Sequence, residues 1–239
     1  MPNQFPAFPD HTEFDIYAYM STSREIGGDF YDYFLIDEDH LGLVMGDVSD
    51  KGVPAAMFMV ITKTLIKNQA LQGSSPAEVL QSVSEQLAEG NNSAMFAAVW
   101  MAVLELSTGK GVAANAGQEH PILRRAGKRF EQVKYRHSPP VGAMEGIRFR
   151  EHEFQLEPGD TLFVHTDGIA EVASAQNGTF GDERIMEALN REPDATPSVL
   201  LQTVQFAVED FSGGESQADD VTMMAVKYYG PGNPSDTWR

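Results

Sequence analysis

The chain has 239 residues, of which 42% are hydrophobic and 22% charged, as is ordinary for a globular protein. It carries 17 Lys and Arg against 35 Asp and Glu, and its net charge of −18 argues against nucleic acid or an anionic membrane as a partner. With no cysteine, the chain has no disulfide, no thiolate metal site and no cysteine nucleophile. The longest apolar run, Met95 to Leu104, is shorter than the ~18–20 residues that span a bilayer.

The predicted elements begin after an extended lead-in over residues 1–12, where three prolines exclude regular structure. Apolar and aromatic runs predict β-strands over 14–20, 29–36, 41–48, 95–106, 110–116, 129–135, 152–156, 161–166 and 221–229. Turn signals at 36–42 and 107–111 join consecutive runs and favour antiparallel neighbours. We expect residues 230–239 to form a flexible tail.

Helices are predicted between these strands. Pro54 opens one over 54–71, whose first half is apolar all round and is therefore expected to be buried. A capping box at 75–78 opens a second, Thr196 and Pro197 open a third, and a short one is expected over 182–190. The pattern predicts one α+β domain over residues 13–229, an αββα sandwich of two mainly antiparallel sheets packed face to face and flanked by helices.

Four predicted strands carry aspartates at glycine-bordered or polar ends: Asp29, Asp47, Asp167 and the pair Asp219 and Asp220. Each alone is explained by a turn or a strand end. If the strands share one sheet edge, however, the carboxylates converge, and their repulsion costs several kcal/mol unless positive charge lies among them. Lys51 is the one nearby basic residue. Divalent cations with oxygen ligands are therefore the expected counter-charge.

Five motifs occur in order along the chain: EIGGDFYDYF, GDVSDKGVPAAMFM, NAGQEHP, HTDGIAE and ADDVTMMAV. Together they resemble the bacterial, SpoIIE-like branch of the metal-dependent PPM-type serine/threonine protein phosphatases, from about Phe14 to Tyr229. The resemblance implies a β-sandwich flanked by helices with two Mn²⁺ or Mg²⁺ ions at one end. It also implies hydrolysis of phosphoserine or phosphothreonine by a metal-activated water, on a regulatory protein of the STAS (anti-anti-sigma) type.

The same resemblance assigns roles to individual residues. Asp47 matches the carboxylate that bridges both ions, with the backbone carbonyl of Val48 as a neighbouring ligand. Asp29 matches the ligand of one ion and is catalytic, with Asp47, through the metal-bound water. Asp167 and Asp219 match the ligands of the other ion, and the adjacent Asp220 is hardly separated from Asp219 by sequence. Weaker candidates for substrate contact or for outer positions around the metals are Arg24, Asp32, Asp50 and His120.

Two positions depart from the family pattern. Relatives commonly have SGKG where this chain has Asp50 in place of the first glycine, and aspartate tolerates a positive φ better than most residues. Relatives often have NAGHxP, whereas Gln118 stands at the histidine position here and cannot shuttle a proton. His120, two residues further on, is kept as a weak candidate for that role.

Three alternatives remain beside hydrolysis by this family's chemistry. The domain can be a catalytically weak module that binds a regulator. An aspartyl-phosphate hydrolase is disfavoured because Leu41 stands where its LIDEDHL loop needs Thr or Val, and an EF-hand fails because Val48 replaces the bidentate glutamate. We expect a cytoplasmic chain, or the cytoplasmic part of a membrane-bound sensor with an upstream sensor domain. The metal preference and the formation of a homodimer are left open.

Overall fold

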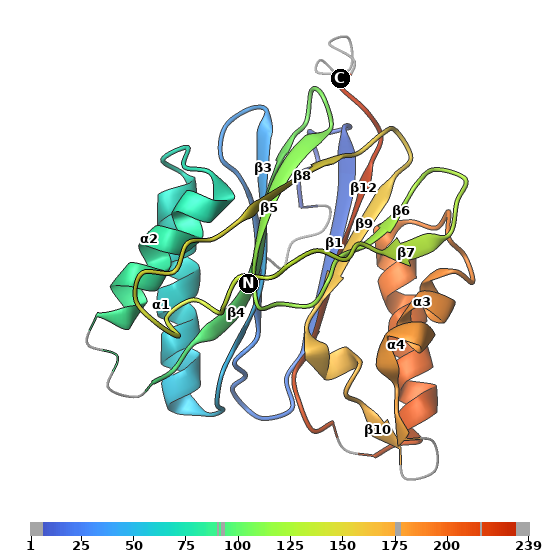
Figure 1. The fold of residues 1–239 in the computed structure, drawn as a ribbon. Helices are drawn as coiled ribbons and strands as arrows, with labels where there is room; N and C mark the ends of the chain where they lie inside the picture. Colours follow the sequence, from blue (N-terminus) through green and yellow to red (C-terminus); the bar gives the residue numbers. More distant parts are fainter. Residues whose placement is uncertain (1–6, 90, 92–93, 175–177, 216, 233–239) are drawn as a thin grey trace.

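The computed structural model describes residues 7–89, 91, 94–174, 178–215 and 217–232. Two β-sheets pack face to face, and a pair of helices covers the outer face of each sheet (Figure 1). This arrangement confirms the predicted αββα sandwich. Of the predicted lead-in, Ala7 and Phe8 pack against the core between the sheets, while residues 1–6 and the tail residues 233–239 lie outside the described residues.

The first sheet has the strand order β2-β3-β4-β5-β8, with every neighbouring pair antiparallel. Its strands are β2 (Phe30–Leu35), β3 (His40–Val48), β4 (Ala97–Glu105), β5 (Lys110–Ala116) and β8 (Glu151–Gln155). Phe30, Phe34 and Val44 face the helices α1 (Val53–Ala70) and α2 (Pro76–Ala88), whereas Tyr31 and Met45 face the other sheet. Strand alternation therefore gives this sheet two apolar faces, one for each neighbouring layer.

The second sheet has the order β1-β12-β9-β6-β7. Its strands are β1 (Phe14–Ser21), β12 (Val221–Tyr228), β9 (Thr161–His165), β6 (Ile122–Arg124) and β7 (Phe130–Gln132). Helices α3 (Gly181–Leu189) and α4 (Pro197–Ser212) cover its outer face. A short 3₁₀ helix, η1 (Asp167–Ile169), follows β9, and β10 (Ala173–Ser174) pairs antiparallel with β11 (Gly178–Thr179).

The expectation that the first half of α1 is buried is wrong. Ala55 is buried, but Val53, Met57, Val60 and Ile61 are 49–63% exposed. The helix packs on the core through Ala55, Thr62, Ile66 and Ala70, with Phe58, Met59 and Leu65 partly buried beside them, so Val53, Met57, Val60 and Ile61 remain on the exposed side. Among the described residues, none of the helices combines the length and apolar character that crossing a membrane requires.

The strand pairing brings the predicted aspartates to one end of the sandwich. In the first sheet Phe30 lies opposite Gly46, so Asp29 at the start of β2 lies beside Asp47 near the end of β3. In the second sheet Met223 lies opposite His165, so the segment preceding β12 lies beside the start of η1. The loops that join β1 to β2 and β3 to α1 lie together at the lower end of Figure 1.

Candidate metal centre

The carboxyl groups of Asp29 and Asp47 lie on neighbouring strands at this end and interact electrostatically. Burial, and then the charge of Asp167, raise the pKa of Asp47 to about 7, and the charges of Asp219 and Asp220 contribute to the same rise. Burial and then Asp219 raise the pKa of Asp167 as well. Carboxylates from four separate chain segments therefore interact electrostatically at one place.

Asp29 is only 2% exposed and is held by two threonines of the second sheet. Its Oδ2 accepts hydrogen bonds from Thr166 Oγ1 at 2.8 Å and Thr222 Oγ1 at 2.5 Å. Burial, and then the charge of Asp47, raise its pKa well above the usual range, while the two hydroxyl groups lower it. Sequence reasoning missed both threonines, although they stand inside the HTDG and DDVT motifs.

Glycine keeps the space beside Val48 open. A Cβ atom on Gly28 would lie 3.1 Å from the Val48 carbonyl oxygen and 3.7 Å from Asp47 Oδ1. On the opposite side, a Cβ on Gly168 would lie 1.9 Å from the Asp220 carbonyl oxygen. The β1–β2 loop and η1 can therefore approach the carboxylates closely because both positions lack a side chain.

Asp219 and Asp220 have different surroundings. Asp220 is buried and accepts hydrogen bonds from the backbone N–H groups of Ser23 and Gly28, each at 2.8 Å, so it fastens the β1–β2 loop. The Asp219 carboxylate is 34% exposed and forms an ion pair with Lys51, whose Nζ lies 2.9 Å from Asp219 Oδ1. These contacts distinguish two residues that the sequence hardly separates: the Asp220 carboxylate binds backbone N–H groups, and the Asp219 carboxylate binds the Lys51 ammonium group.

The residues present fit a divalent cation in the chemistry of their donor atoms. Within the described part of the chain, no three acidic or histidine side chains stand together as ligands of a single ion. The available donors are carboxylate and carbonyl oxygens, which are the ligands that Mg²⁺ and Mn²⁺ prefer. The carboxyl groups with raised pKa values lack a sufficient counter-charge, and Gly28 clears space beside Val48.

Asp32 does not join this cluster. It is 3% exposed and lies on the helix-facing side of β2, where Lys63 Nζ is 3.2 Å and Lys67 Nζ 3.8 Å from its Oδ2. Its Oδ1 also accepts the N–H of Tyr33 at 3.0 Å. Asp32 therefore connects α1 to the first sheet. It lies on the helix-facing side of that sheet, whereas Asp29 and Asp47 meet at one end of the space between the two sheets.

We predict that Asp32→Asn lowers the free energy of unfolding by about 1–3 kcal/mol, because it leaves the partly buried Lys63 ammonium without its counter-charge. Cation affinity should stay unchanged, since the Asp32 side chain does not reach the cluster. Urea unfolding and a Mn²⁺ titration of the same variant check the two expectations. A clear loss of Mn²⁺ affinity in the folded variant would place Asp32 among the outer residues of the metal site after all.

The remaining candidates stand in loops. Arg24 is exposed in the β1–β2 loop, and Asp50 is exposed in the β3–α1 loop with φ 76°. At this positive φ of Asp50 a glycine is the usual residue, and aspartate is tolerated. His120 Nδ1 lies 2.9 Å from His137 Nε2 and its ring packs edge-on against Tyr135, so it belongs to an aromatic group beyond β5. Burial, and then Lys134, lower the pKa of His120.

Gln118 is buried in the turn that follows β5. Asn115 Oδ1 accepts the Gln118 N–H at 2.8 Å, and Gln118 Oε1 accepts the N–H of Glu119 at 2.9 Å. Its Nε2 is buried without a hydrogen-bond partner among the described residues. The Gln118 side chain thus stabilises the turn through Oε1. Its Nε2 belongs to an amide, which does not take up or release a proton near neutral pH.

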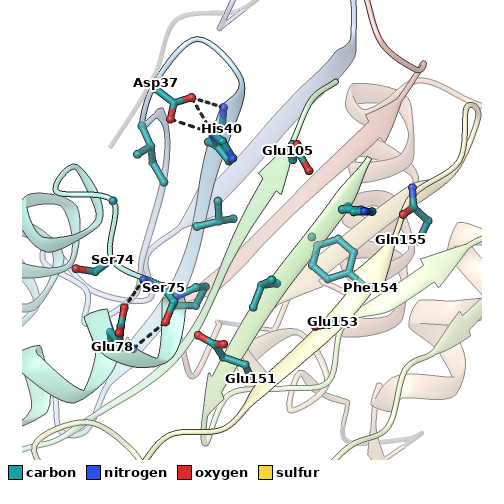
Figure 2. A pocket seen from close by; sticks show the side chains of 17 residues that line it. Asp37, His40, Ser74, Ser75, Glu78, Glu105, Glu151, Glu153, Phe154 and Gln155 are labelled. Carbon is teal, nitrogen blue, oxygen red and sulfur yellow. Dashed lines mark hydrogen bonds and ion pairs between the residues drawn. The ribbon is translucent and has the colours of Figure 1, made fainter. Parts of the chain in front are cut away.

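Two hollows differ in their relation to the carboxylates. A cavity of about 560 Å³ adjoins the site and is lined by Lys51, Asp219, Glu171, Val172 and Glu209, among others. A groove of about 870 Å³ lies at the far end of the first sheet, between the start of α2 and the outer faces of β4, β5 and β8 (Figure 2). Its carboxylates are partly engaged locally, as in the Asp37–His40 contact and the Ser75–Glu78 capping box. None of the predicted site residues lines this groove.

Comparison with known proteins identifies the class. Residues 37–229 match the family model described as Stage II sporulation protein E (SpoIIE). The chain is 31% identical to Protein IcfG of Synechocystis sp., over 92% of this chain and 39% of the relative. It is 21% identical to phosphoserine phosphatase RsbP of Bacillus subtilis, over 92% and 53%. The SiaA-PP2C domain of Pseudomonas aeruginosa superimposes with a TM-score of 0.78 at 21% identity, covering 89% of this chain and 85% of that one.

The two-sheet fold is that of PPM-type (PP2C-type) phosphatase domains. The chain belongs to the SpoIIE family, the bacterial branch of that class. The chain spans about two fifths of the length of IcfG and about half of the length of RsbP, so each of these relatives contains sequence beyond the matched domain.

Proposed function

We propose that the chain hydrolyses phosphoserine or phosphothreonine on a regulatory protein, in a reaction that depends on two divalent cations, Mn²⁺ or Mg²⁺. The observation that carries the proposal is the meeting of Asp29, Asp47, Asp167 and Asp219 at one end of the sandwich, with raised pKa values at the first three. Such a cluster stores repulsion that a structural role does not require, and bound cations relieve it.

In this proposal the cations are held by the four carboxylates and by the carbonyl oxygen of Val48. When bound, they supply the positive charge and Lewis acidity that attack of water on a phosphate dianion requires. Asp47, central among the carboxylates, would contact both ions, and Asp29 would be oriented by its two threonine partners. Asp220 is a positioning residue, because its hydrogen bonds to Ser23 and Gly28 hold the β1–β2 loop over the site.

The proposed substrate is a phosphorylated regulatory protein of the STAS, anti-anti-sigma type, encountered in the cytoplasm. The motifs of the sequence imply it, and the name phosphoserine phosphatase carried by RsbP is in keeping with it. An exposed, strongly acidic surface is compatible with an anionic substrate only where cations cancel the charge, which is at the carboxylate cluster. Domain limits at 13 and 229, a fused sensor domain and self-association belong to the same proposal.

The test is phosphate release from p-nitrophenyl phosphate and from a phosphoserine peptide, with Mn²⁺, with Mg²⁺ and with EDTA. We expect release to require a cation and Asp167→Asn to lower it at least ~10-fold, since loss even of groups behind metal ligands costs 10–100-fold. Asp37→Asn, which removes the same charge at the far end of β3, should leave it unchanged. No release with any cation would instead favour the non-catalytic binding module, the alternative that Gln118 at the histidine position suggests.

A further inference from the structure

Lys51 is in contact with the carboxylate cluster through one of its members. Its Nζ lies 2.9 Å from Asp219 Oδ1 and donates a second hydrogen bond, also of 2.9 Å, to the carbonyl oxygen of Ala218. The other lysine and arginine ion pairs of the described residues involve Asp32, Asp160 and Asp194. In the described part of the chain, Lys51 thus makes the ion pair that reaches this cluster.

The backbone directs Lys51 to this position. The residue stands between Asp50, with φ 76°, and Gly52, with φ 90°, in the loop that carries the chain from Asp47 into α1. Two positive φ values in three residues fold the loop sharply, and the lysine reaches a segment 167 residues away in sequence. A loop that leaves the Asp47 strand therefore joins the Asp219 segment of the opposite sheet.

The contact uses the atom that a cation would need. Asp219 Oδ1 accepts the N–H of Asp220 at 2.8 Å in addition to the Lys51 ammonium group. A divalent ion bound to the same carboxylate would lie within a few ångströms of Nζ, where the repulsion of like charges is large. An ion at Asp219 and the ammonium at its present position therefore exclude each other.

The adjoining cavity gives the lysine an alternative position. Lys51, Glu171 and Glu209 all line the hollow of about 560 Å³ beside Asp219. Burial, and then the charges of Asp167 and Asp219, raise the pKa of Glu171, while the charge of Lys51 lowers it, so the two side chains are close enough to interact. Both Lys51 and Asp219 are 34% exposed, so the pair can open without moving the core.

We propose that Lys51 is an internal counter-ion that holds Asp219 when no cation is bound and competes with the divalent cation for that carboxylate. The inference rests on the proposed metal centre and adds to it a residue that sets its affinity. Because Asp219 is paired with the ammonium group, cation binding must first release it.

The experiment is a calorimetric Mn²⁺ titration of the metal-free full chain, which needs no activity. Lys51→Met removes the competitor and is expected to bind Mn²⁺ roughly 3- to 5-fold more tightly, the range of an exposed ion pair. Lys67→Met, which removes the same charge at α1, should bind within about twofold of the wild type. Lys51→Arg keeps the charge and should bind no more tightly than the wild type.

The outcomes distinguish a failure of the proposed role of Lys51 from a failure of the proposed metal centre. Equal Mn²⁺ affinity in Lys51→Met and the wild type, or an equal gain in Lys67→Met, overturns the role of Lys51 and leaves the metal centre standing. Absence of Mn²⁺ binding in the wild type overturns both. Circular dichroism in EDTA verifies that each variant is folded; should Lys51→Met unfold, tighter binding by Lys51→Arg would contradict the proposal on its own.

Discussion

Asp47→Asn is expected to abolish phosphate release and, in the same molecule, to stabilise the cation-free protein. Activity should fall more than ~100-fold, because the change removes a negative oxygen ligand shared by both proposed ions, and even supporting groups behind ligands are worth 10–100-fold. Stability should rise because Asp47 is buried beside other carboxylates: burial, and then the charge of Asp167, raise its pKa to about 7. Above that pH, its ionisation opposes folding by up to roughly 4 kcal/mol, and relaxation reduces this to about 1–3 kcal/mol.

The opposite signs of the two effects are what make the variant informative. When a carboxylate with a structural role is neutralised, the protein loses stability, as we expect for Asp32 with its lysine partners. When a carboxylate retained for cation binding is neutralised, the protein gains stability and loses activity. Urea unfolding at pH 8 in EDTA, together with the Mn²⁺-dependent phosphate assay, measures both quantities. A destabilised Asp47→Asn with full activity would contradict the assignment on both counts.

The sequence predicted most of the fold because its strands carry strong local signals. The runs at 110–116 and 221–229 alternate or remain apolar between clear turns, and the observed β5 and β12 match them closely. The strand β6 was missed because it has only three residues, Ile122–Arg124, between a proline and a glycine turn. So short a run gives no periodicity, and its strand geometry comes from pairing with β7 and β9.

Burial on α1 was predicted wrongly for a different reason. An apolar helix surface is usually a buried one, and the sequence of α1 has no polar face in its first half. How much of that surface a neighbour covers depends on the width of the contact with the core, and here the contact covers one side of the helix only. Tertiary packing determines that width, so the sequence of the helix alone could not predict it.

The candidate site was predictable in its members but not in their contacts. The motifs place Asp29, Asp47 and Asp167 at strand ends, and the antiparallel register then brings them together. The different contacts of Asp219 and Asp220 depend on which loop each side chain meets. Asp220 meets Ser23 and Gly28, about 190 residues away in the sequence, so local sequence does not predict the contact. The position of Asp32 on the helix side of β2 follows from alternation and could have been inferred from Phe30 and Phe34.

In the absence of cations the protein is expected to lose stability as the pH rises from 5 to 8. The pKa of Asp47 is about 7 in the folded state, above its ordinary value near 4 in the unfolded chain. Between these values the folded protein binds a proton that the unfolded chain has released. Linkage then makes the stability fall with rising pH, by up to ~1.4 kcal/mol per pH unit from this one group. The stabilisation is complete below about pH 4 and is lost above about pH 7.

A bound cation should reverse this trend, because it favours the ionised carboxylates that the empty site disfavours. At a Mn²⁺ concentration 100 times the dissociation constant, the folded state gains about 2.7 kcal/mol, which raises Tm by roughly 5–10 °C for a chain of this size. The measurement is thermal unfolding at pH 5 and pH 8, in EDTA and in Mn²⁺, for the wild type and Asp47→Asn. Subtracting the variant's pH profile removes the contribution of other titrating groups. Parallel profiles for the two proteins in EDTA would mean that Asp47 is not the buried carboxyl group that couples folding to pH, and the electrostatic argument for cations at this end of the sandwich would then lose its main support.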